Sequence, residues 1–139
     1  MQNLFLFLLL APAGLLMAAP QGPGGHDRRE TPEAIAQLTK DAAALETQVL
    51  AQPKNTELYI KLGFTYSRLK KADDAQRAFE NAVRLDPKRA IAHYMLGLIF
   101  EKKGLKDRAI QAWKACLDNT ADPRLRDTAR KHLHHLGAR

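Results

Sequence analysis

Cysteine is almost absent from this sequence, and so are the residue patterns that mark common catalytic sites. Cys116 is the single cysteine, so an internal disulfide is excluded and the fold must be held together by packing. The sequence contains no Gly-rich phosphate-binding loop, no nucleophile elbow and no His-x-x-x-His motif with a glutamate. These absences predict a protein that is not an enzyme and that uses no cofactor.

Charge is missing from the N-terminal segment. Met1 to Gly25 contains no Lys, Arg, Asp or Glu, and Leu4 to Leu10 is an unbroken apolar run. A membrane-spanning helix needs about 20 continuous apolar residues, whereas a shorter run followed by small residues is typical of a signal peptide. We therefore expect residues 1–19 to be a signal peptide or an N-terminal anchor, residues 20–30 to be a flexible linker, and the folded domain to be exported to the periplasm or secreted.

Positive charge is in excess in the rest of the chain, which carries the whole formal net charge of +7. A basic protein can bind nucleic acid, anionic lipid or acidic proteins. Acidic and basic residues are interleaved, as in KKADDAQRAFE, which is typical of solvated helix faces. Because export disfavours nucleic acid, we expect no nucleic-acid partner, and membrane-surface binding is the weaker alternative to binding a protein.

Strand-like alternation is also absent, and the apolar residues after the linker have helical spacing. Thr31-Pro32-Glu33 is a typical helix start, with a capping hydroxyl followed by proline at the first helical position. Further along the chain, residues recur at an offset of 34, which is the period of a helix–turn–helix repeat. The recurring pairs are Leu62 and Leu96, Gly63 and Gly97, Ala75 and Ala109, and Phe79 and Trp113.

These residues resemble the tetratricopeptide repeat family. The first copy fits the pattern W-x2-L-G-x2-Y…A-x3-F-x2-A-x4-P, with tyrosine in place of tryptophan. Its residues are Tyr59, Leu62, Gly63, Tyr66, Ala75, Phe79, Ala82 and Pro87. The second copy supplies His93, Leu96, Gly97, Phe100, Ala109, Trp113 and Cys116. Cys116 therefore occupies a small packing slot, and we expect it to be structural.

The resemblance implies an all-α fold, an α-α superhelix in which helix–turn–helix repeats form a short right-handed solenoid. We expect a domain over residues 31–139 with six helices: an N-terminal helix in 31–53, two helices in 56–89, two in 90–123, and a capping helix in 124–139. The terminal helices are expected because a repeat buries its core only against neighbours, so both ends need a cover.

The resemblance also implies that a partner segment binds on the concave face, which is lined by the first helix of each repeat. Ile60 and Phe64 lie there in the first repeat, and Tyr94 and Leu98 are their equivalents in the second. Apolar residues at such positions indicate that something covers them. The cover is either an apolar or helical segment of a partner, or the N-terminal helix and adjoining helices of the array.

Basic residues extend the predicted groove. Arg68 and Lys102 stand near its edge and could pair with acidic residues of a partner. Counting from Asp86-Pro87 to Asp122-Pro123 gives an offset of 36, and this two-residue insertion places Arg130 and His134 in continuation of the groove. The family's clamp for acidic chain termini uses Lys and Asn at the groove positions that are apolar here, so that clamp is absent.

The histidines near the C-terminus raise the question of a metal site. His132 and His135 are three residues apart, but two histidines with no acidic or cysteine partner at ligand spacing fall short of one. We therefore predict no metal. The favoured function is a non-enzymatic interaction module or adaptor in a bacterial cell envelope. The alternative is a structural module that assembles into homo-oligomers.

Overall fold

The computed structural model describes residues 30–138, and within that range the chain is all helical with no strand. The helices are α1 (Pro32–Ala51), α2 (Thr56–Arg68), α3 (Ala72–Leu85), α4 (Ala90–Lys102), α5 (Lys106–Asn119) and α6 (Pro123–His135). The prediction of six helices in an all-α fold is confirmed. The predicted signal peptide and most of the linker lie outside the described residues.

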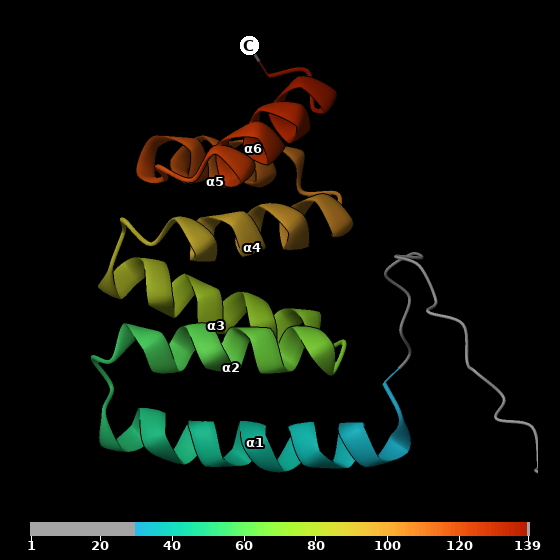
Figure 1. Cartoon of the computed structure of the whole chain (residues 1–139), viewed down its shortest axis with the longest axis vertical. Helices are drawn as coiled ribbons and strands as arrows, with labels where there is room; N and C mark the ends of the chain where they lie inside the picture. The colour runs from blue at the N-terminus through green and yellow to red at the C-terminus, as the bar shows by residue number, and fades with distance from the viewer. Residues whose placement is uncertain (1–29, 139) are drawn as a thin grey trace, which may run out of the picture.

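The helices follow one another along the long axis of the molecule, with α1 at one end and α6 at the other (Figure 1). Helices that are neighbours in the stack are also consecutive in the sequence, as expected when each hairpin packs only against its neighbours. The N-terminal end of the described chain and its C-terminus therefore lie at opposite ends of the stack. No helix among residues 30–138 is long and apolar enough to cross a membrane.

The first and last helices begin with the same capping arrangement. The Thr31 hydroxyl accepts a hydrogen bond from the Ala34 amide at 3.2 Å, and the Asp122 carboxylate accepts one from the Arg124 amide at 2.8 Å. In each case a proline follows the cap, where its missing N–H costs nothing. The start at Thr31 was predicted from the sequence, whereas α6 begins at Pro123, one residue before the range predicted for the capping helix.

Each hairpin is closed by a glycine that lies against a large ring. A Cβ on Gly63 would lie 2.7 Å from the ring carbons of Phe79, and a Cβ on Gly97 would lie 2.6 Å from Trp113. Both rings are fully buried, and burying a side chain of this kind contributes roughly 1.5–3 kcal/mol. The glycines are therefore required by close approach of α2 to α3 and of α4 to α5.

The turns that lead into α2 and α4 are fastened by an equivalent bond. The Tyr59 hydroxyl donates to the carbonyl of Pro53 at 3.1 Å, and Nε2 of His93 lies 2.7 Å from the carbonyl of Pro87. Tyr59 and His93 occupy the same slot of the two repeats, 34 residues apart. Two different side chains thus hold the same turn.

Candidate functional site

The side chains predicted to form the groove differ in their solvent exposure. We call the surface formed by α2 and α4 around Phe64, Arg68, Tyr94, Leu98 and Lys102 the first-helix face. Phe64 is 38% exposed, Tyr94 and Leu98 are half-buried, and Arg68 and Lys102 are exposed. These five residues are accessible to a partner.

Ile60 is a correction to the predicted groove. Its side chain is only 6% exposed and belongs to the hydrophobic core together with residues of α4, such as Leu96. Adjoining helices of the array therefore cover Ile60. This was one of the two covers that the sequence analysis proposed, the other being a segment of a partner. Phe64, one turn further along α2, keeps an exposed surface.

The aromatic residues of the first-helix face stand on the buried rings of the hairpins. The Phe64 ring meets Phe79 edge to face, with centroids 5.4 Å apart, and the Tyr94 ring meets Trp113 in the same way at 5.3 Å. Edge-to-face pairs of this kind are favourable beyond the area they bury. The core therefore holds both Phe64 and Tyr94 in place.

Arg68 is already engaged by a carboxylate of the same chain. Its Nε lies 2.9 Å from Oε1 of Glu30 and its second guanidinium nitrogen 3.3 Å from Oε2. This hydrogen bonding from Arg68 lowers the pKa of Glu30. Glu30 directly precedes the cap of α1, so the ion pair ties the start of α1 to the end of α2.

The capping helix has a different register from the predicted one. α6 begins at Pro123, 33 residues after α4 begins at Ala90, which is one residue less than the repeat period and not two more. Arg126 then occupies the slot of His93, and its guanidinium donates to the carbonyls of Leu117 at 3.1 Å and Thr120 at 3.0 Å. The predicted two-residue insertion is wrong.

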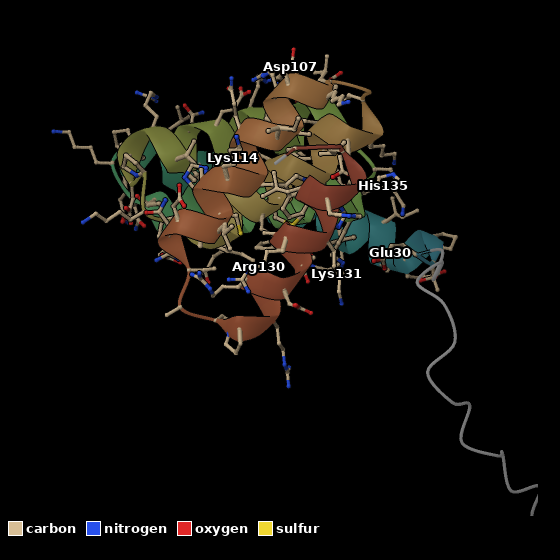
Figure 2. The ribbon with its side chains drawn as sticks, turned by 90° about the horizontal axis from the view of Figure 1, so that it is seen from above. Glu30, Asp107, Lys114, Arg130, Lys131 and His135 are labelled. Atoms are coloured by element: carbon tan, nitrogen blue, oxygen red, sulfur yellow. The ribbon has the colours of Figure 1, made fainter. Side chains whose placement is uncertain are left out.

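This register moves two residues of the predicted site. Asp127 and Lys131, not Arg130 and His134, take the slots of Tyr94 and Leu98. Arg130 lies in the slot of Gly97 and lines a shallow hollow with other residues of α6, while His134 is exposed. Figure 2 shows Arg130 and Lys131 on α6, viewed onto the C-terminal end of the stack. A long side chain is tolerated in the glycine slot because no described helix follows α6.

A polar cluster that sequence analysis missed lies between α4, α5 and α6. The Trp113 indole N–H donates to Oε1 of Glu101 at 2.6 Å, and Nδ1 of His132 lies 2.8 Å from the same oxygen. The His132 and Trp113 rings are stacked, with centroids 4.2 Å apart. The available signal was the tryptophan itself, because a buried indole N–H needs an acceptor.

The cluster gives His132 a packing role. Glu101 and Trp113 hold its ring, and the side chain joins the capping helix to the second hairpin. Among residues 30–138 no three His, Cys, Asp or Glu side chains are placed to share a metal ion. Cys116 is fully buried, and burial raises the pKa of its thiol, which makes it a poor nucleophile.

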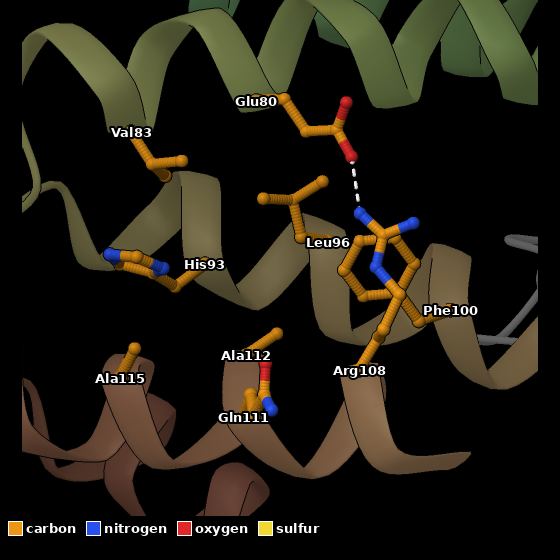
Figure 3. A pocket seen from close by; sticks show the side chains of 9 residues that line it. All are labelled: Glu80, Val83, His93, Leu96, Phe100, Arg108, Gln111, Ala112 and Ala115. Carbon is orange, nitrogen blue, oxygen red and sulfur yellow. Dashed lines mark hydrogen bonds and ion pairs between the residues drawn. The ribbon is translucent and has the colours of Figure 1, made fainter. Parts of the chain in front are cut away.

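A further hollow of about 290 Å³ lies between α3 and α5, over the floor that α4 provides (Figure 3). At one end Arg108 crosses from α5 to Glu80 of α3, at 2.6 Å, with its guanidinium 4.1 Å above the Phe100 ring. His93 stands at the other end. The floor is apolar, so this hollow can hold an apolar side chain but presents no set of groups for catalysis.

Comparison with known proteins supports the repeat assignment. A family model described as tetratricopeptide repeat matches residues 60–123, which covers most of α2 and all of α3, α4 and α5. Residues 60–123 are tetratricopeptide repeats. Proteins with tetratricopeptide repeats are generally modules for binding other proteins, and this coarse function follows from the assignment.

Solved structures with the same architecture are found. One of them, MamA MSR-1 C2, superimposes with a TM-score of 0.58 over 73% of this chain, at 20% sequence identity. At this identity the likeness concerns the fold alone, and the chain spans 59% of the length of the MamA chain. No curated protein matches the sequence.

Proposed function

We propose that this tetratricopeptide repeat protein is a non-enzymatic adaptor that binds a segment of another protein on its first-helix face. The supporting observation is that Phe64, 38% exposed, and the half-buried Tyr94 and Leu98 project from first helices held on a rigid core. Preorganised apolar side chains of this kind lose little conformational entropy when a partner covers them. Lys102 beside them favours a segment that carries an acidic residue.

The proposal is tested with the full chain as bait in an extract of bacterial envelopes. Leu98→Glu places a charge in the middle of the first-helix face, whereas Lys114→Glu places the same charge on the exposed side of α5. A partner captured by the wild type and by Lys114→Glu, but not by Leu98→Glu, supports the proposal. Equal capture by all three overturns it.

The cellular setting is part of the proposal and rests on the sequence alone. The charge-free segment before residue 26 favours export to the bacterial envelope. Fractionation of cells that produce the full chain, followed by N-terminal sequencing of the mature protein, tests this directly. Recovery of an intact N-terminus from the cytoplasm would contradict it.

Self-assembly is the competing explanation for the same exposed residues. Light scattering with size exclusion at low and high protein concentration distinguishes the two. A monomer at both concentrations leaves the first-helix face free for a different protein. A dimer that Leu98→Glu dissociates would mean that the face pairs with a second copy.

A further inference from the structure

A second unfilled surface lies at the N-terminal end of the stack. It is a cleft of about 460 Å³ between α1 and α2. The lining residues are Asp41, Ala44, Leu45 and Gln48 from α1, and Lys61, Phe64 and Thr65 from α2. We call it the α1–α2 cleft. Only Phe64 is shared with the first-helix face.

The repeat period shows what the α1–α2 cleft corresponds to. Each of its α1 residues lies 34 positions before a residue of α3. The α3 equivalents are Ala75, Ala78, Phe79 and Ala82, all of which are at most 4% exposed. In α3 this face is covered by α2, as the contact between the Gly63 position and the Phe79 ring shows. On α1 the same face is open.

The α2 side of the cleft leads to the same conclusion. Lys61 and Thr65 lie 34 positions before Met95 and Ile99, which are half-buried and buried where the first hairpin packs against α4. The α1–α2 cleft is therefore the seat of a first helix that would complete the repeat to which α1 belongs. The period places that helix at residues 22–34, but this sequence, GPGGHDRRETPEA, belongs to the Gly- and Pro-rich linker and to the start of α1.

The charged and apolar residues of the α1–α2 cleft indicate the kind of helix that fits it. Asp41 and Gln48 stand where the complete repeats have small apolar residues, and Lys61 stands where α4 has methionine. Ala44, Leu45 and Phe64 remain apolar. A fully apolar occupant, such as the segment Leu4 to Ala19, would bury the Asp41 carboxylate with only the Gln37 amide as a hydrogen-bond partner, at 2.8 Å. It would also bury the Lys61 ammonium without a counter-charge, and burial of such charges is costly. The complementary occupant has an apolar stripe flanked by a cation toward Asp41 and an anion toward Lys61.

We propose that the α1–α2 cleft binds an amphipathic helix of a partner protein, which completes the first repeat in trans. The mode is helix-in-groove recognition, in which apolar anchors at helical spacing enter the groove. It extends the proposed protein-binding function to a different surface, so either can hold without the other. The binding helix runs antiparallel to α1, as α2 runs antiparallel to α3.

The test uses as its probe the sequence of α2, the first helix that covers the equivalent face of α3. A fluorescein-labelled peptide with the sequence of residues 56–68, TELYIKLGFTYSR, is titrated with the full chain and followed by fluorescence anisotropy. Ala44→Arg fills the cleft with a long charged side chain. Ala43→Arg adds the same side chain at the neighbouring residue, which is also exposed but does not line the cleft.

We expect the peptide to bind the wild type and Ala43→Arg equally, and Ala44→Arg at least about tenfold more weakly, a change of about 1.4 kcal/mol. Leu98→Glu should not alter this binding, which separates the cleft from the first-helix face. Failure of the wild type to bind the peptide, or equal binding by Ala44→Arg, overturns the proposal.

Two other occupants are distinguished by measurements on the same variants without peptide. If the wild type is a dimer that Ala44→Arg alone dissociates, the cleft holds a second copy. If Ala44→Arg alone lowers the thermal unfolding midpoint of the monomer, the cleft holds another segment of the same chain. Either result overturns the assignment to a partner helix.

Discussion

The two complete repeats have the same arrangement of helices but differ in the buried ring and in the hydrogen bonds around it. In the α2–α3 hairpin the buried ring is Phe79, which needs no hydrogen bond. In the α4–α5 hairpin it is Trp113, whose indole N–H is served by Glu101. The residue 34 positions before Glu101 is Ser67, whose hydroxyl donates to the carbonyl of Gly63 in its own helix. The two repeats therefore differ at two linked positions: the buried ring is Phe79 or Trp113, and the first-helix residue is Ser67 or Glu101.

A second difference concerns a glutamate that α1 and α3 carry at equivalent positions, 34 residues apart. Glu46 of α1 accepts a hydrogen bond from the Tyr66 hydroxyl. Glu80, in the equivalent slot of α3, pairs with Arg108, which lies over Phe100. Phe100 occupies the slot of Tyr66 but has no hydroxyl. The repeat period determines the position of each side chain. Its hydrogen-bonding partner depends on which residues occupy the neighbouring helix.

The largest expected effect is loss of the buried ring. Trp113→Ala should lower the free energy of unfolding by about 3–5 kcal/mol, because the side chain is fully buried. Phe79→Ala should cost less than Trp113→Ala, since the ring is smaller and no capping-helix side chain stacks on it. Urea unfolding followed by circular dichroism measures both. A greater loss at Phe79 would contradict a stabilising role for the stack of His132 on Trp113.

The next effect tests the acceptor of the indole N–H. Glu101→Leu should cost about 1–3 kcal/mol, because it leaves a buried donor without a partner. Glu101→Gln retains an oxygen acceptor and should cost less. In the first repeat, Ser67→Ala should change stability by no more than about 0.5 kcal/mol. Trp113 is the only tryptophan, so its fluorescence reports on the site directly, and an unchanged spectrum in Glu101→Leu would count against the bond.

A smaller effect is expected in the turns inside the hairpins. Lys70 has φ 60° and Gly104, its equivalent, has φ 71°. A residue with a Cβ is disfavoured by roughly 1–2 kcal/mol in this left-handed conformation. We therefore expect Lys70→Gly to stabilise the protein and Gly104→Ala to destabilise it, each by about 1 kcal/mol. Thermal unfolding of both variants checks the opposite signs, and two shifts of the same sign would be incompatible with this explanation.

The smallest effect is confined to alkaline pH. Desolvation, together with the hydrogen bond to Glu46, raises the pKa of Tyr66 from 10.0 to about 12. The neutral phenol is thus favoured by folding, so this stabilisation is present below pH 10 and is lost as the pH rises toward about 12. Tyr66→Phe, which copies Phe100, should remove this pH dependence. Absorbance titration of the phenolate would contradict the assignment if all three tyrosines ionised together near pH 10.

The sequence by itself determined the architecture of this protein. The offset of 34 between Gly63 and Gly97 predicts two hairpins, because only glycine allows a helix to approach a large ring so closely. The caps at Thr31 and Asp122 fix where the first and last helices begin. These are local or strictly periodic signals, so they can be read from the sequence without knowing which helices pack together.

Only the tertiary structure decided which of the predicted groove residues reach solvent. Ile60 and Phe64 have the same apolar character and lie four positions apart, but one is buried by adjoining helices and the other is not. The register of α6 was also decided in three dimensions, because Arg126 fastens the turn before α6 through two carbonyls, a bond that no spacing predicts. The α1–α2 cleft was likewise found only in three dimensions, because the repeat period does not show which faces of α1 and α2 are left uncovered. Burial and register are properties of pairs of helices, and a sequence pattern describes each helix alone.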